Sequence, residues 1–334
     1  MLNRIGAAAR QWVGLSPWTN VYGLARTLIA LGTLGTLLFS HSSSLFRPAS
    51  GAPDFPYCHG LSNASIYCLV PDGQLELARW ISVVILLVAA SGWRPRWTAL
   101  PHWWVAFSLQ CTATIPDGGD QIAAILTLLI LPIALTDRRR WHWSRPEPLD
   151  TAPRWATTVL VAWSASVMVR VQMAGIYLHA SVAKLGVAEW VDGTAIYYWL
   201  HHPLFGAPGW AAWFVHPLVQ QWWGTLALTW GPLALEFLLA LGLIAKRSFR
   251  PYLLAGGIAL HLSIALLMGL WSFALVMFGG LVMFLRPLEQ SLPLPRWAKR
   301  MRSLLPAPRE PESSAAPEGT QEAAQPAAPV PAGR

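Results

Sequence analysis

The sequence predicts an all-α integral membrane protein with about eight transmembrane helices and both termini in the cytoplasm. Three observations lead to this prediction. Hydrophobic residues make up 54% of the 334 residues, whereas charged residues make up only 12%, about half the share found in a soluble domain. The mean hydropathy of the chain is +0.41. The chain also has 20 tryptophans, and tryptophan collects at membrane interfaces.

Eight apolar segments are long enough to cross a bilayer, which takes roughly 20 residues. They cover residues 20–40, 74–93, 98–115, 119–136, 155–180, 222–245, 251–270 and 271–286. The arginines and lysines between them predict the orientation, because cytoplasmic loops carry an excess of both. Basic clusters occur at the N-terminus, in every second loop and after the last segment. Eight helices with both ends inside satisfy this alternation.

The segments between and around the helices define the domain organisation. Residues 1–19 are a cytoplasmic N-terminal segment, and residues 20–288 are the transmembrane domain. Two long extracytoplasmic loops interrupt this domain. The loop 41–73 has four prolines that exclude a continuous helix, and the loop 184–221 is rich in Trp, His and Pro, as interfacial segments are. Residues 289–334 begin with a basic stretch suited to anionic lipid and continue as a disordered Pro- and Ala-rich cytoplasmic tail.

The net charge of +8 lies in the short clusters that flank the apolar segments. It therefore indicates topology, and no nucleic-acid partner is expected. The partner expected for the apolar surface is membrane lipid.

An ionisable residue near the middle of a predicted membrane helix requires a partner or a function. Arg170 lies midway along the fifth segment, Glu236 near the middle of the sixth and His261 near the middle of the seventh. If they face one another, they share hydrogen bonds. One interpretation is a structural clasp between three helices, and the other is an intramembrane site open to the outer face. Arg26, near the inner end of the first segment, is expected to extend its guanidinium to the interface.

Lys184 follows the fifth segment on the outer side, where the topology disfavours lysine. Glu189 and Asp192 follow within two turns and are candidates to pair with it. A partly desolvated lysine can serve as a base or a nucleophile. The alternative is an interfacial anchor beside Trp190. His179 lies near the outer end of the same helix and is expected to line the same cavity.

Two further sets of residues belong to the outer loops. Asp120, in the turn TIPDGGDQ before the fourth helix, is expected to cap that helix or to offer its carboxylate to a cavity. Cys58 and Cys68 share one exported loop, so a disulfide is expected between them. The alternative, a redox-active pair, lacks a CxxC spacing. His201 and His202 are interpreted as solvated interface residues, so no metal site is expected.

Three strings of the sequence resemble the sporulation-delaying protein B (SdpB) family. They are PDGGD at 116–120, YLHASVAKLGVAEWVDG at 177–193, and the run from PLALEF at 232 to VMFLRP at 287. The resemblance covers residues 15–288. The family belongs to the wider HTTM group, which includes vitamin K-dependent γ-carboxylase. Membership implies an HTTM-like bundle in the bacterial cytoplasmic (inner) membrane. It also implies a small SdpA-like partner protein and a secreted SdpC-like peptide precursor.

The function implied by this resemblance is the maturation or export of a secreted peptide toxin, or bacteriocin. The residues expected to take part as catalytic groups are Lys184, Glu236 and His261. Those expected to line the cavity are Asp120, Arg170 and His179. One alternative is a γ-carboxylase-like enzyme with Lys184 as its base. Another is a proton-coupled transporter with Arg170, Glu236 and His261 as the relay.

The resemblance to the carboxylase has two departures. One extra residue separates Lys184 from Trp190, and Asp-Gly-Gly-Asp replaces the Asn-Asn-His string of the carboxylase. No cofactor is therefore expected.

Overall fold

Helices make up almost all of the regular structure. The computed structural model describes residues 12–48, 50–51, 54–71, 73–114, 116–146 and 153–293. The eight long helices of this part are α2 (Asn20–Phe39), α5 (Leu75–Ser91), α6 (Pro95–Thr112), α7 (Gly118–Thr136), α8 (Pro153–Lys184), α12 (Trp222–Ala240), α13 (Arg250–Met268) and α14 (Trp271–Leu285). Within the same residues there is no strand, only an isolated bridge between Trp93 and Trp141.

Each long helix coincides with one apolar segment predicted from the sequence. Five of them, α2, α7, α8, α12 and α13, are long and apolar enough to cross a membrane by length and composition, and α14 is a shorter apolar helix. The expectation of an all-α membrane protein is confirmed at this level. Eight crossings and two cytoplasmic termini remain predictions.

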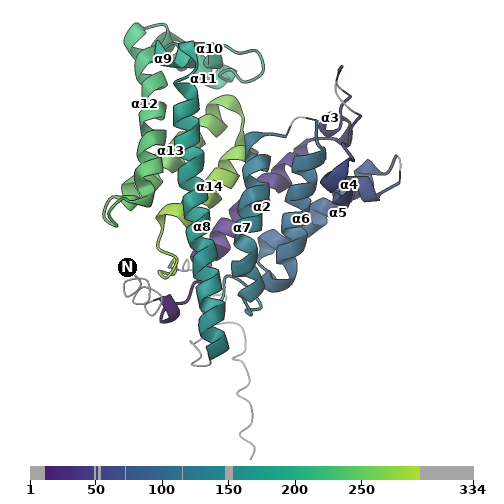
Figure 1. Cartoon of the computed structure of the whole chain (residues 1–334). Coiled ribbons are helices and arrows are strands. Elements are labelled where there is room, and N and C mark those ends of the chain that lie inside the picture. The colour runs from purple at the N-terminus through teal and green to yellow at the C-terminus, as the bar shows by residue number, and fades with distance from the viewer. Residues whose placement is uncertain are drawn as a thin grey trace, which may run out of the picture. The chain divides into compact units, whose positions relative to one another are not determined.

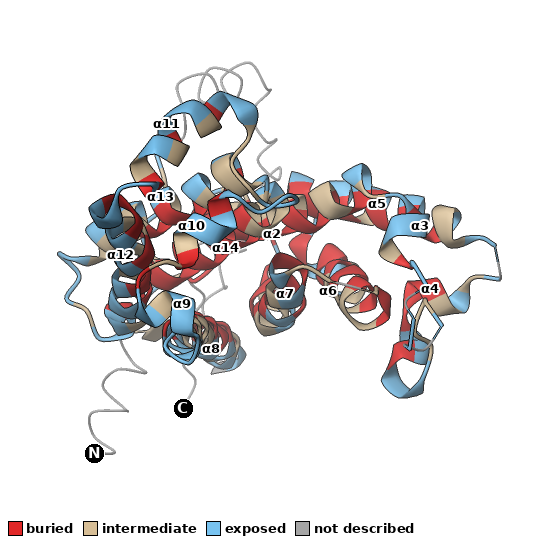
Figure 2. Cartoon of the chain, turned by 90° about the horizontal axis from the view of Figure 1, so that it is seen from above, coloured by how far each residue is buried: buried red, intermediate tan, exposed pale blue. Residues whose placement is uncertain are grey.

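The long helices form two layers, seen end-on in Figure 2. Neighbouring contacts order one layer as α12, α13, α14, α2 and α5, and the other as α8, α7 and α6. The layers join where α8 packs on α12 and α14, where α7 packs on α14 and α2, and where α6 packs on α5. The helix α14 is therefore surrounded, which explains why most of its residues are buried.

The tightest packing joins α14 to α2. A β-carbon on Gly32 of α2 would lie 2.8 Å from the carbonyl oxygen of Ser272, and one on Gly279 of α14 would lie 2.7 Å from that of Ala25. Both positions therefore require glycine, as in membrane helix pairs whose backbones approach closely.

Short helices gather at one end of the bundle, as Figure 1 shows. The segment after α2 forms α3 (Ser42–Leu45), η1 (Gly60–Ala64) and α4 (Ile66–Leu69), and the segment after α8 forms α9 (Ala188–Val191), α10 (Ala195–Leu200) and α11 (Gly209–Val219). A short 3₁₀ turn, η2 (Leu241–Leu243), continues α12. We call the end that holds α3, α4 and α9–α11 the disulfide end, because the segment containing α3 and α4 carries the disulfide described next.

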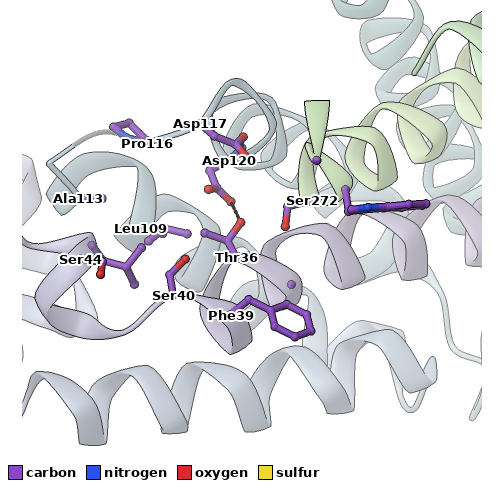
Figure 3. Close-up of a pocket in the computed structure, with 14 residues that line it drawn as sticks. Thr36, Phe39, Ser40, Ser44, Leu109, Ala113, Pro116, Asp117, Asp120 and Ser272 are labelled. Carbon is purple, nitrogen blue, oxygen red and sulfur yellow. Dashed lines mark hydrogen bonds between the residues drawn. The ribbon is translucent and has the colours of Figure 1, made fainter. Parts of the chain in front are cut away.

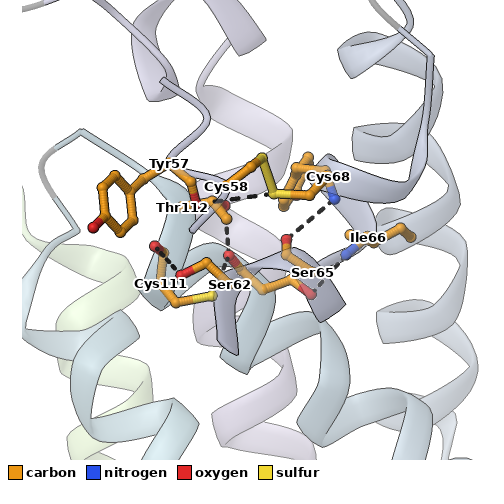
Figure 4. Close-up of a disulfide and its surroundings, with 10 residues drawn as sticks. Tyr57, Cys58, Ser62, Ser65, Ile66, Cys68, Cys111 and Thr112 are labelled. Carbon is orange, nitrogen blue, oxygen red and sulfur yellow. Dashed lines mark hydrogen bonds between the residues drawn. A yellow bond between two sulfur atoms is a disulfide. The ribbon is translucent and has the colours of Figure 1, made fainter. Parts of the chain in front are cut away.

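Cys58 and Cys68 form a disulfide, with their α-carbons 5.7 Å apart (Figure 4). The loop that it closes is held against α6. The Ser108 hydroxyl accepts the backbone N–H of Ile66 at 3.0 Å, and the Trp104 indole donates to the carbonyl of Ala64 at 2.7 Å. The described residues of this segment are thus held against the bundle by hydrogen bonds to α6.

At the opposite end, Asp137 and Arg139 form a buried ion pair in the segment after α7. Arg139 Nη2 lies 2.7 Å from Asp137 Oδ2, and Nε donates to Oδ1 at 2.9 Å. The two side chains are 3% and 1% exposed. Arg139 also donates to the carbonyl of Ser144 at 2.7 Å, so the pair fixes the turn that leads toward His142.

The expectation that Arg26 reaches the interface is wrong. Its side chain is buried on the face of α2 that meets α5 and α6. There it donates to the carbonyl of Ala89 at 3.3 Å and to the hydroxyl of Thr98 at 2.7 Å. Because the last turn of α5 and the first turn of α6 offer these acceptors inside the bundle, the guanidinium is satisfied without reaching the membrane surface.

Candidate functional site

The centre of the candidate site is an ion pair between the last residue of α8 and a residue in the C-terminal part of α12. Lys184 Nζ donates to both oxygens of Glu236, at 2.8 Å to Oε1 and 2.6 Å to Oε2. The side chains are 24% and 11% exposed, so both charges are partly withdrawn from solvent. This pairing replaces the expected partners of Lys184, Glu189 and Asp192, of which Asp192 accepts hydrogen bonds from Thr194 instead.

Trp190 covers the other side of the lysine. The short turn after α8 leads into α9, and this brings the Trp190 ring to 5.2 Å from Lys184 Nζ. At this distance the ring face attracts the ammonium group. The Lys184 and Trp190 of the string at 177–193 therefore act together, since the ring and the carboxylate hold one ammonium between them.

A second pair lies deeper between the helices. The Tyr177 hydroxyl of α8 and the His261 Nε2 of α13 are 2.9 Å apart, and both residues are buried. The Nδ1 of His261 has no hydrogen-bond partner in the described structure. The ring of Phe273, on α14, packs edge-on to His261 at 5.3 Å between centroids.

The two pairs form one group of side chains, which we call the polar network: Tyr177, Lys184, Glu236 and His261. Tyr177 precedes Lys184 by seven residues, which is about two helical turns and places both on one face of α8. The network therefore links α8, α12 and α13 near the disulfide end.

The chemistry available to the network is proton exchange. Glu236 holds the Lys184 ammonium by both of its oxygens, and a lysine amine that has released its proton can act as a base or a nucleophile. His261 adds a group that both donates and accepts. Arginine in place of Lys184 would keep the charge but could not release the proton.

The structure does not assemble the expected triad of Arg170, Glu236 and His261. Arg170 precedes Lys184 by 14 residues of α8, about 21 Å along the helix axis. Its Nη2 donates to the carbonyl of Arg286, at 3.4 Å, near the end of α14. Only Glu236 and His261 of the proposed clasp or relay thus lie together. His179 is exposed and lies about 200° around α8 from Tyr177, so it is outside the network.

Asp120 lies in a different place, a cavity of about 710 Å³ at the disulfide end (Figure 3). The cavity lies between the end of α2, the end of α6, the start of α7 and the turn from α13 to α14. Asp120 is not the helix cap. Asp117 caps α7, because its Oδ1 accepts the backbone N–H of Gly119 and, at 3.0 Å, that of Asp120. This leaves the Asp120 carboxylate to the cavity, where the Thr36 hydroxyl donates to it at 3.3 Å.

The network and the cavity are neighbours through one residue. A β-carbon on Gly118 would lie 3.6 Å from the Phe273 ring, and one on Gly119 would lie 2.7 Å from the Phe273 α-carbon. The same Phe273 ring contacts His261. The expected single cavity is not formed, because Asp120 lines the cavity at the disulfide end, whereas Lys184, Glu236 and His261 are not among its lining residues. Among the described residues, no group of three or more His, Cys, Asp or Glu is placed to hold a metal ion.

Comparison with known proteins places the chain among bacterial relatives. It is 38% identical over 294 residues to the "Uncharacterized protein YitO" of Bacillus subtilis (strain 168), an alignment covering 87% of this chain and 93% of that protein. It is 33% identical over 279 residues to sporulation-delaying protein SdpB of the same organism, covering 83% of this chain and 84% of SdpB. The chain belongs to the SdpB family. No family model and no solved structure matches it.

The family assignment confirms the resemblance seen in the sequence. Within this SdpB-family chain, two members of the site were not found by reading the sequence, Tyr177 and Phe273. Tyr177 carried a signal, because it precedes Lys184 by two turns and so shares its face of the helix. Phe273 carried none, because its role depends on how α7, α13 and α14 meet.

Proposed function

We propose that this chain is the membrane component of a system that matures or exports a secreted peptide toxin. It works with a small SdpA-like protein on a secreted SdpC-like precursor, and the polar network is the place where it acts. The observation that carries the proposal is the Lys184–Glu236 pair, bidentate and partly buried, in a chain of the SdpB family.

The placement of the network supports this role. Lys184 ends α8 and lies directly before the aromatic helices α9–α11, so it lies toward the disulfide end of the bundle. A peptide arriving from that side meets the ammonium–carboxylate pair first. Tyr177 and His261 form a second hydrogen-bonded pair between the same group of helices.

We further propose that the disulfide end faces the exterior of the bacterial inner membrane and that both termini are cytoplasmic. The disulfide supports this orientation, since such bonds persist in oxidising compartments, and the basic clusters support it from the opposite end. A cysteine introduced at Asp54 should react with an impermeant maleimide in intact cells, and one at Arg138 should react only after lysis. Labelling of position 138 in intact cells would overturn the orientation.

Deletion and repair in the host organism tests the function. Loss of the gene should remove one or more secreted mature peptides from the medium, as measured by mass spectrometry, and the wild-type gene should restore them. Glu236→Gln keeps the shape of the side chain but cannot accept the lysine proton, so it should be present in the membrane and fail to restore the peptides. Glu189→Gln, an exposed carboxamide substitution in α9, is the matched control and should restore them. An unchanged set of secreted peptides after deletion would refute the proposal.

A second candidate function is a chemical step on the peptide itself with Lys184 as the base. It is favoured by the 2.6 Å contact, which gives the lysine proton a nearby acceptor. A change of mass in the mature peptide, beyond proteolysis, that depends on Lys184 would distinguish this enzyme from a carrier or presenter.

A further inference from the structure

The cavity at the disulfide end carries an inference of its own. Its volume of about 710 Å³ falls within the range of small-ligand sites. Four hydroxyls line it, together with two carboxylates and the rings of Phe39 and Trp271, which are both exposed to solvent. The hydroxyl residues are Thr36, Ser40, Ser44 and Ser272.

The charge of the lining is entirely negative. None of the described residues around the cavity is Lys, Arg or His. The carboxylate of Asp117 is engaged by the backbone N–H groups at the start of α7, so its charge belongs to the helix cap.

Asp120 is left without a positive partner. It is 3% exposed, and its Oδ1 accepts one hydrogen bond from Thr36. Among the described residues, no hydrogen bond reaches its Oδ2 and none of the ion pairs includes it. A buried carboxylate normally requires such a partner, because desolvation of its charge costs several kcal/mol. Figure 3 shows Asp120 beside Thr36 at the cavity.

We propose that this cavity binds a primary ammonium group of an exported peptide, either its N-terminus or a lysine side chain, with Asp120 as the counter-ion. An ammonium has three N–H donors. The free carboxylate oxygen of Asp120 and the hydroxyl oxygens of Ser40 and Ser272 can accept one hydrogen bond each from them. Phe39 and Trp271 at the rim provide apolar surface for the carbon chain that carries the amine. The cavity is far larger than one metal ion needs.

A phosphatidylethanolamine head group has the same ammonium chemistry. It also carries a phosphate next to the amine, and this lining has two carboxylates and no described basic residue to neutralise that phosphate. A peptide amine lacks this conflict. The peptide source rests on the proposed function, whereas the ammonium site itself rests on the cavity.

Binding to the purified full-length protein tests the site directly. The protein is placed in phosphatidylglycerol nanodiscs and titrated with three probes by calorimetry: alanyl-leucine amide, N-acetyl-alanyl-leucine amide and Nα-acetyl-lysine amide. The two probes with a free amine should bind, and the N-acetylated dipeptide should bind at least about ten-fold more weakly, because a charge-assisted hydrogen bond is lost. Equal binding of all three would overturn the proposal.

Two variants locate the binding. Asp120→Asn should weaken the free-amine probes by about ten-fold or more while leaving the melting temperature unchanged or higher, because it removes an unpaired buried charge. Asp54→Asn makes the same charge change at an exposed position outside the cavity and should bind as the wild type does. If Asp120→Asn does not fold, Ser44→Trp serves instead, since Ser44 is exposed on α3 and a larger side chain there should close the cavity.

The remaining outcomes separate the sources and the two proposals. Loss of probe binding in nanodiscs that contain phosphatidylethanolamine would assign the cavity to a lipid head group and overturn the peptide site. Probe binding that depends on Asp120, with unchanged secreted peptides after gene deletion, would overturn the function and keep the site. A changed set of secreted peptides after gene deletion, with no probe binding to the purified protein, would keep the proposed function and overturn the ammonium site.

Discussion

Two ion pairs lie near opposite ends of the bundle, and they differ in burial and in the parts of the chain that they join. Arg139 and Asp137 are two residues apart, almost fully buried and joined by two parallel hydrogen bonds. Lys184 and Glu236 are distant in sequence, less buried, and join two long helices. Arginine presents a planar fork of donors, whereas lysine presents a compact ammonium group. The arginine pair therefore fixes a turn, and the lysine pair ties two long helices together.

The surroundings of the pairs reinforce this difference. The Nη1 group of Arg139 also donates to the backbone carbonyl of Ser144, in the same segment. Lys184 contacts the Trp190 ring as well as its carboxylate, and part of its side chain is open to solvent. The arginine pair is thus enclosed by its own segment, whereas the lysine pair is partly accessible.

The largest expected effect on stability comes from breaking the arginine pair. Asp137→Asn should lower the free energy of unfolding by about 3–5 kcal/mol, because it leaves a buried guanidinium without its counter-charge. Thermal unfolding of the detergent-solubilised protein measures this loss, and Asp54→Asn, at an exposed carboxylate, should show none. A melting temperature equal to that of the wild type would show that the turn does not depend on the pair.

The lysine pair should respond in function rather than in stability. Lys184→Ala should reach the membrane and reduce secreted mature peptide by about 100-fold or more, the scale of losing an acid–base group. Lys184→Arg should fail equally, because it preserves the charge without a releasable proton. Peptide yield by mass spectrometry, divided by membrane protein, gives the measure. Full yield from the arginine variant would reduce Lys184 to a structural tie like Arg139.

Removing the disulfide measures how much the Cys58–Cys68 bond contributes to the stability of the protein. Replacing Cys58 and Cys68 together by serine should cost about 2–3 kcal/mol, because the bond closes a short loop of the unfolded chain. Intact-mass analysis without reductant should also show the wild-type protein two mass units lighter than its reduced form. If both thiols are free in that measurement, the expected bond is absent.

The smallest effect concerns pH at the opposite end. Burial, with the positive charges of Arg26 and Arg139, lowers the pKa of His142 well below its ordinary value. The unfolded chain therefore binds a proton at this residue near pH 6.5 when the folded chain does not, so stability falls as the pH drops below about 6.5. The slope is at most about 1.4 kcal/mol per pH unit for one histidine. His142→Gln should have a shallower dependence between pH 8 and 5.5, and an unchanged slope would contradict the assignment.

Properties that depend on neighbouring residues were predictable from the sequence. Each of the eight apolar segments matches one long helix, because a continuous stretch of apolar residues is enough to predict a membrane helix. The matching helices are α2, α5, α6, α7, α8, α12, α13 and α14. The pairing of Cys58 with Cys68 followed from their position in one loop.

The helix cap was less certain, since Asp117 and Asp120 both lie next to the glycines where α7 starts. Capping requires a residue outside the helix whose side chain folds back onto the first N–H groups. The structure gives this role to Asp117, and that choice releases Asp120 to the cavity. Three residues along the chain thus separate a structural carboxylate from a candidate binding group.

The amino-acid sequence alone predicted the class of protein, its helices and the charged residues that are unusual inside a membrane. Which of those residues meet depends on how the helices pack. Glu236 was grouped with Arg170, but a helix displaces residues by 1.5 Å each, so Arg170 lies about 21 Å from the end of α8 where Lys184 meets Glu236. Which side chains meet across helices depends on how each helix is rotated about its axis and shifted along it relative to its neighbours. Neither quantity can be read from the sequence of a single helix.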